Sequence, residues 1–286
     1  MKNVIVPKPK NDSLVAQLES LYRTFLDISP GEKVNFDLSL LDWAYPLLIL
    51  PISAYINNTK SDYVISNSPI KSHLERVNFP QGVDSVSLFQ KHIQRNKKYI
   101  PITVLKRGVG ASKEELEALF IEKIYGVLGN VSGARSALFY PITELATNIF
   151  DHSKKDMGFI FSQFYPSKNY LDICIVDCGR GFAATYKEER GLELSDANAI
   201  SEAMKGNSVK PEKERGYGIW TSKKIVCEVL GGGGFILISG SAGLAAMNKK
   251  EKLISFPYPR FYWQGAIIAY RIKKPSGPLD ISPFIE

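Results

Sequence analysis

Cysteine and histidine are scarce in this chain, which has 286 residues and three of each. The cysteines (Cys174, Cys178 and Cys227) form no Cys-x-x-Cys pair, and no histidine lies close to them in the sequence. An odd count with this spacing argues against a disulfide framework and against a zinc site. We therefore expect small, buried thiols.

The chain is also short of long apolar runs. Its most apolar stretch, residues 43–56, is too short to span a bilayer and contains Pro46 and Pro51. Residues 1–12 hold no apolar core of the length that a secretory signal requires. Because 44% of the residues are apolar and 23% are charged, a disordered, fibrous or coiled-coil chain is excluded. We expect a soluble, cytoplasmic protein with no membrane partner.

The charge is modestly basic, with 36 Lys and Arg against 29 Asp and Glu and a net charge of +7. The excess is spread along the chain, without a long basic run and without arginine interleaved with aromatic residues. This pattern favours a solvated surface over a nucleic-acid-binding patch, so we expect no nucleic-acid partner. A modest positive balance suits a protein that binds a phosphate-bearing ligand.

A turn-rich polar segment, KRGVGAS at residues 106–112, separates two parts of the chain. The patterns before it predict helix 13–28, strand 33–41, helix 43–56, strand 62–66, helix 68–77 and strand 98–106. This order is typical of a small α/β domain, which we place at residues 1–106. In residues 107–286 the patterns predict helices at 112–130, 133–153 and 221–230, a hairpin at 159–177, a partly helical segment at 186–205, and strands at 235–239 and 265–272.

Four motifs that could carry chemistry follow one another in the second part. In the first, ELATN, Glu144 and Asn148 stand four residues apart and would share one face of a helix. A carboxylate and a carboxamide placed in this way can hold a hydrated divalent cation and activate a water or hydroxyl.

In the second motif, IVDCGRGF, an apolar strand ends in Asp177, which can accept a hydrogen bond from an exocyclic amine. Gly179 and Gly181 follow it and allow a sharp turn and close approach to a ligand.

The third motif, RGYG, places Gly216 and Gly218 at the start of an amphipathic helix. Backbone amides at a helix N-terminus favour phosphate, and Arg215 adds positive charge beside them. The fourth motif is a late strand, WQGAII, in which Gly265 permits close approach of the backbone. Each motif alone is also compatible with a purely structural role, as an exposed helix face, a tight turn or a glycine-rich helix entry.

Taken together, the order ExxxN, DxGxG, GxG and a glycine-marked strand resembles the GHKL family of ATP-binding domains (gyrase-, Hsp90-, histidine-kinase- and MutL-like). The resemblance covers about residues 112–273, and ELATNIFDHS is similar to the matching motif of the anti-sigma-factor serine kinases. It implies a two-layer α/β sandwich of the Bergerat type, with a mostly antiparallel sheet. Residues 107–286 would form this domain, so that the whole chain is of the α/β (α+β) class.

The resemblance also implies a role for each motif. Asn148 would bind the Mg²⁺ that bridges the phosphates of ATP, and Glu144 would be the catalytic base that positions or deprotonates the attacking water or hydroxyl. Asp177 would bind the adenine amine. The other cofactor-binding residues would be Gly179 and Gly181 at the adenine, Arg215, Gly216 and Gly218 at the phosphates, and Gly265 in the late strand. Residues 182–215 would form a mobile lid, in which Lys205, Lys210 and Lys213 are further phosphate-contact candidates.

The sequence departs from the family in two places. Ala266 follows Gly265 where the family often has a threonine, whose hydroxyl helps to bind the aspartate or its water. His73 and His92 lack the setting of a phosphoacceptor histidine, which argues against histidine kinase activity.

The N-terminal part, over residues 34–79, resembles the STAS domain of the anti-sigma-factor antagonists. The serine that is phosphorylated at a helix start in that family is not matched, because Asp42 to Pro46 contains neither Ser nor Thr. The resemblance then implies a built-in partner or a dimerisation surface, which leaves a homodimer open, and not a phosphorylation switch.

These observations predict an Mg-ATP-binding regulatory protein that is an ATPase or a protein Ser/Thr kinase. Binding of ATP or ADP would order the lid, and the ordered lid would alter the binding of a regulatory protein partner. An alternative is a nucleotide-sensing interaction module without significant turnover. A third is an S-adenosylmethionine methyltransferase, since VDCGRG fits its cofactor turn, but the following segment, 183–201, lacks the strand that would carry the ribose-binding acid.

Overall fold

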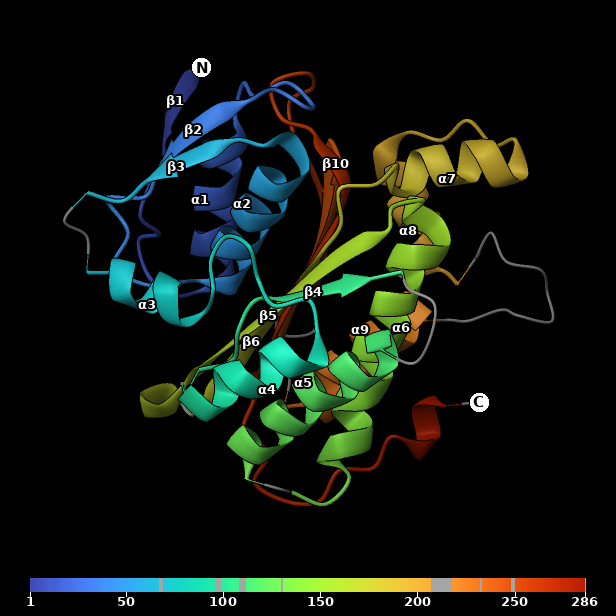
Figure 1. Cartoon of the computed structure of the whole chain (residues 1–286). Helices are drawn as coiled ribbons and strands as arrows, with labels where there is room; N and C mark the ends of the chain where they lie inside the picture. Colours follow the sequence, from blue (N-terminus) through green and yellow to red (C-terminus); the bar gives the residue numbers. More distant parts are fainter. Residues whose placement is uncertain are drawn as a thin grey trace.

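The computed structural model describes residues 1–66, 69–95, 99–107, 112–129, 131–206, 218–231, 233–247 and 250–285. Within them the chain is a mixed α/β protein with two sheets, one parallel with three strands and one antiparallel with seven (Figure 1). The expected α/β class with a mostly antiparallel second sheet is thereby confirmed.

The parallel sheet has the strand order β1 (Lys2–Ile5), β2 (Val34–Asp37), β3 (Asp62–Val64). Helix α1 (Leu14–Phe25) connects the first two strands and begins at Ser13, whose hydroxyl accepts a hydrogen bond from the Ala16 amide at 3.1 Å. Helix α2 (Pro46–Thr59) connects the second and third, with Pro46 in its first turn as the sequence predicts. We call residues 1–80, which also hold helix α3 (Lys71–Arg76), the N-terminal unit.

The antiparallel sheet has the order β4-β5-β6-β10-β7-β8-β9. Its strands are β4 (Thr103–Lys106), β5 (Met157–Tyr165), β6 (Tyr170–Val176), β7 (Gly234–Gly240), β8 (Ala242–Met247), β9 (Lys250–Ser255) and β10 (Trp263–Lys273). The predicted hairpin is β5–β6, turned by the short 3₁₀ helix η1 (Pro166–Lys168). Strand β4 pairs with β5, so the chain enters this large sheet before the expected domain boundary at residue 106.

One face of the large sheet is covered by helices. They are α4 (Val86–Arg95), α5 (Ser112–Leu128), α6 (Ala134–Ser153), α8 (Asp196–Met204), α9 (Gly218–Lys224) and the π-helical turn η3 (Ile225–Val229) that continues α9. Helix α7 (Gly181–Arg190) lies at the end of the sheet against β7 and β10. Among the described residues, none of the helices combines the length and the apolar character needed to cross a membrane.

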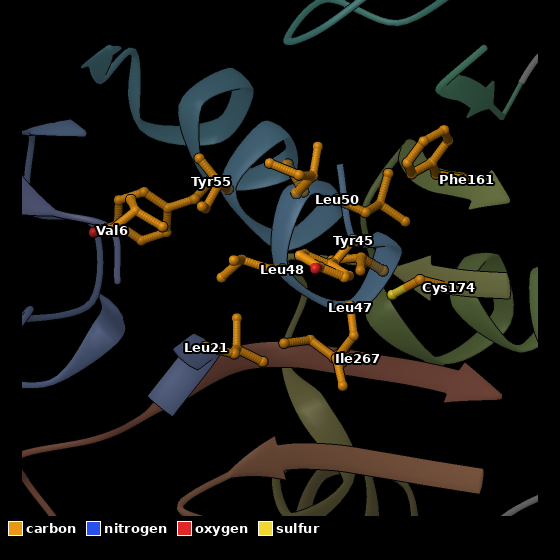
Figure 2. Close-up of a cluster of buried hydrophobic side chains, with 14 of the residues drawn as sticks. Val6, Leu21, Tyr45, Leu47, Leu48, Leu50, Tyr55, Phe161, Cys174 and Ile267 are labelled. Atoms are coloured by element: carbon orange, nitrogen blue, oxygen red, sulfur yellow. The ribbon is translucent and has the colours of Figure 1, made fainter. Parts of the chain in front are cut away.

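The N-terminal unit covers the other face of the large sheet, with α1 and α2 between the two sheets (Figure 1). Figure 2 shows Leu47 and Leu50 of α2 beside Phe161 of β5, Cys174 of β6 and Ile267 of β10. Successive residues of a strand point to opposite faces, so a sheet covered on both faces needs apolar residues at every position. This explains why the central strands are apolar at most positions, on both faces.

The prediction that the cysteine thiols are buried is confirmed for two of the three cysteines. Cys174 and Cys178 are buried, whereas Cys227 is only partly buried, and all three are free.

Candidate functional site

Helix α6 carries the first motif, and it faces the start of α9. Glu144 and Asn148 are both half-buried, one turn apart on the same helix. A Cβ atom added to Gly218 would lie 2.7 Å from Glu144 Oε2 and 3.4 Å from Asn148 Nδ2. Because Gly218 has no side chain, the backbone of α9 lies close to these two groups without displacing the Glu144 carboxylate. The structure thus brings the ExxxN motif and the second glycine of the GxG motif together.

Asp177 follows the end of β6 and is almost completely buried, with 4% of its surface exposed. Its Oδ1 accepts a hydrogen bond from the Gly179 amide at 2.7 Å, and its Oδ2 accepts one from the Ala266 amide at 3.1 Å. Burial raises the pKa of the Asp177 carboxyl to about 7, although both amides and the charge of Lys155 act in the opposite direction. The carboxylate is therefore held in place by the backbone of its own loop and of β10.

The late strand reaches Asp177 because Gly265 has a conformation that L-residues rarely adopt. Its φ is +110°, and the pairing of β10 with β7 shifts register between Trp263 and Ile267. A Cβ atom on Gly265 would lie 2.3 Å from the Asp177 carbonyl oxygen and 2.7 Å from Oδ1. The predicted close approach at Gly265 is confirmed. At position 266, where the chain has alanine, the contact with the Asp177 side chain is made by the backbone amide.

The two glycines after Asp177 fit against separate parts of the fold. A Cβ atom on Gly179 would lie 2.4 Å from the Cβ of Ser153, the last residue of α6. Gly181, with a φ of +76°, turns the chain from the loop into α7. Beside it, the Ser239 hydroxyl of β7 donates to the Gly265 carbonyl at 2.7 Å and accepts from the Phe182 amide at 3.2 Å. The second and fourth motifs are thus in contact with each other, and the C-terminal end of α6, the helix that carries the first motif, packs against Gly179.

Some predicted residues lie outside the described part of the chain. These are Arg215 and Gly216 of the third motif and the candidates Lys210 and Lys213 of the expected lid. Of that lid, residues 182–206 are described, and they contain most of α7 and all of α8. Lys205, at the end of α8, is paired with Glu202 at 2.7 Å.

Sequence reasoning did not identify two residues that shape the site. Ser239 is buried and joins three segments through its hydroxyl. Trp263 donates from its indole Nε1 to the Asp177 carbonyl oxygen at 3.1 Å. Neither contact has a signal in the sequence, because the partners are backbone atoms and lie 26 to 86 residues away.

The donor set fits a magnesium ion that arrives with a nucleotide. In the described part of the chain no three or more His, Cys, Asp or Glu side chains converge to bind a metal on their own. Mg²⁺ is usually held by one or two protein oxygens together with substrate phosphates and water. The Glu144 carboxylate and the Asn148 carboxamide, both beside Gly218, are oxygen donors of this kind.

Comparisons with protein-family models, with curated proteins and with solved structures found no match for this chain.

Proposed function

We propose that this protein binds Mg-ATP between α6, the loop after β6 and the start of α9, and acts as a nucleotide-dependent regulatory protein of the GHKL type. The observation that carries the proposal is the buried carboxylate of Asp177, next to two glycines and fixed by backbone amides. Each carboxylate oxygen has two lone pairs and accepts one amide here, so each retains one for an exocyclic amine. An adenine base supplies such an amine.

The opposite end of the proposed site is suited to phosphate chemistry. Asn148 would supply an oxygen ligand to Mg²⁺, which neutralises the charge of the phosphates when bound. Glu144, one helical turn away, would orient the attacking water or hydroxyl and accept its proton. The same two residues serve hydrolysis and transfer to a protein Ser or Thr, so the proposal covers an ATPase or a protein kinase.

The architecture argues against the methyltransferase alternative. Cofactor turns of the VDxGxG kind follow parallel strands in doubly wound sheets. Here β6 lies between β5 and β10 and is antiparallel to both.

Isothermal titration calorimetry of Asp177→Asn tests the proposed adenine contact. The carboxamide turns one acceptor into a donor that faces the adenine amine, and a buried mismatch of this kind costs about 1–3 kcal/mol, or about 5- to 150-fold in affinity. Glu117→Gln is a matched control, because Glu117 is also a buried carboxyl group but pairs with Lys113 on α5. Equal ATP affinity in Asp177→Asn and the unaltered protein would refute the adenine contact.

Glu144→Gln separates turnover from binding. It keeps the shape of the side chain and removes the proton acceptor, so Mg-ATP should bind with unchanged or tighter affinity. Phosphate release or protein phosphorylation should fall by about 100- to 10,000-fold. Turnover at the unaltered rate would eliminate Glu144 as the base. If the unaltered protein binds ATP but shows no turnover, the nucleotide-sensing interaction module replaces the enzyme.

A further inference from the structure

Trp263 lies between the proposed adenine site and the N-terminal unit. On one side its indole Nε1 donates to the Asp177 carbonyl oxygen at 3.1 Å. On the other side its ring meets Phe25, the last residue of α1, edge to face with ring centroids 5.2 Å apart. Tyr55 of α2 lies 6.5 Å away by the same measure. Figure 1 shows β10, which begins at Trp263, passing beside the N-terminal helices.

This junction is closely packed. Trp263 is 2% exposed and Phe25 3%. Together with Cys178, the residue after Asp177, they line a cavity of only about 20 Å³, which is room for about one water molecule. Tyr55 is fixed in turn, because its hydroxyl donates to the Glu32 carbonyl at 2.7 Å. A displacement of Trp263 is therefore transmitted to α1 and α2 and is not absorbed by empty space.

A second contact attaches the N-terminal unit to the same two strands. Arg271 of β10 and Asp172 of β6 form a bidentate ion pair at 2.6 and 2.7 Å. Gln17 of α1 donates to the same Asp172 carboxylate at 3.0 Å. The strands that carry Trp263 and lead into Asp177 are thus tied to α1 at two places, which makes α1 a rigid support for the site.

We propose that Trp263 is a positioning residue through which docking of the N-terminal unit sets the adenine affinity of Asp177. The inference rests on the function proposed above. The Trp263 indole holds the Asp177 backbone, and Phe25 holds the indole. Coupling between two sites is reciprocal, so the bound nucleotide must also strengthen the docking of α1 and α2.

Two variants test the two halves of this connection. Trp263→Phe keeps an aromatic ring against Phe25 and removes the indole N–H, and Phe25→Leu removes the ring edge that supports the indole. Phe36→Leu is the matched control, because Phe36 is a buried ring of the same cluster, with its centroid 5.7 Å from that of Phe25. All three are made in the full chain and measured well below their melting temperatures.

Calorimetry should show ATP binding about five- to tenfold weaker in Trp263→Phe and Phe25→Leu, and within about twofold of the unaltered protein in Phe36→Leu. Inorganic tripolyphosphate with Mg²⁺ should bind all four proteins equally, because it does not contact Asp177. In hydrogen exchange, ATP should slow the amides of α1 and α2 in the unaltered protein and much less in Trp263→Phe.

Unchanged ATP affinity in Trp263→Phe and Phe25→Leu overturns the role of Trp263 and leaves the proposed function intact. A parallel loss for ATP and tripolyphosphate assigns the effect to general destabilisation and overturns it as well. Absence of ATP binding in the unaltered protein overturns the proposed function, and with it this inference.

Discussion

At the scale of single residues, Asp177 is a carboxyl group that burial makes hard to ionise, since its pKa rises from 3.8 to about 7 on folding. The folded protein then binds a proton that the unfolded chain has already lost. The stability gained from that proton is fully present below about pH 4 and is lost as the pH rises through about 7. Ionising the Asp177 carboxyl group in the ligand-free protein therefore costs stability. Carboxyl groups whose pKa is shifted in this way are common at functional sites.

We expect this group to lower the free energy of unfolding by about 2–3 kcal/mol between pH 5 and pH 8. Asp177→Asn does not titrate, so its stability relative to the unaltered protein should increase with pH over that range. Urea unfolding of both proteins at pH 5, 6, 7 and 8 measures the difference. A difference that is constant across these values would contradict a pKa near 7.

The sequence is sufficient to single out Asp177 and Gly265 as candidate residues but not to predict how they are held. Asp177 and Gly265 are recognisable because their chemistry depends on their own side chains, or on the lack of one. The support from the Ala266 amide and the Trp263 indole depends on backbone atoms of distant segments. No pattern of residue types predicts such contacts, because the backbone amide that donates in the first and the backbone carbonyl that accepts in the second are common to nearly all residue types.

At the scale of elements, the proposed site depends on the register shift of β10 between Trp263 and Ile267, which we call the bulge. Gly265→Ala would place a Cβ atom 2.3 Å from the Asp177 carbonyl oxygen, at a φ of +110° that alanine rarely adopts. We expect a loss of about 2–4 kcal/mol in the free energy of unfolding, together with loss of ATP binding. Thermal and urea unfolding measure the first, and calorimetry the second.

Gly126→Ala serves as the control for that substitution. Gly126 lies inside α5, and a Cβ atom there meets nothing within 4 Å. Alanine favours a helix over glycine by about 0.5–1 kcal/mol, so this variant should be slightly more stable. If Gly265→Ala behaved like Gly126→Ala, the bulge would not be under the steric constraint that we describe.

The three strands that sequence patterns missed have weak apolar signals, whereas the missed helix α4 is amphipathic. Strand β9 (KEKLIS) is largely exposed and charged, and β8 (AGLAAM) consists mainly of small residues. Strand β1 buries only Val4. These segments become strands because they pair with β7, β8 and β2, and the apolar pattern within a segment does not reveal the backbone pairing that it makes with another strand.

At the scale of the whole molecule, the N-terminal unit and the large sheet share one hydrophobic core. The predicted division at residue 106 lies at a turn-rich polar segment, but β4 ends at Lys106 and belongs to the large sheet. The polar centre of the interface is the Asp172–Arg271 pair, in which Asp172 is 1% exposed. Burial raises the pKa of Asp172 in spite of the hydrogen bonds from Arg271, so the carboxylate depends on its partner for its charge.

Arg271→Met should therefore destabilise the protein by about 3–5 kcal/mol, since it leaves Asp172 buried without its counter-charge. Asp172→Leu combined with Arg271→Met removes both charges and should recover much of that loss, because an apolar pair of similar volume pays no desolvation cost. Urea unfolding, followed by far-ultraviolet circular dichroism and by tryptophan fluorescence, measures both variants. The two signals should change in a single coincident transition in the unaltered protein, since one core joins the N-terminal unit to the large sheet. Separate transitions would show that the N-terminal unit and the large sheet unfold independently. A double variant as unstable as Arg271→Met would show that the loss does not come from leaving Asp172 without its counter-charge.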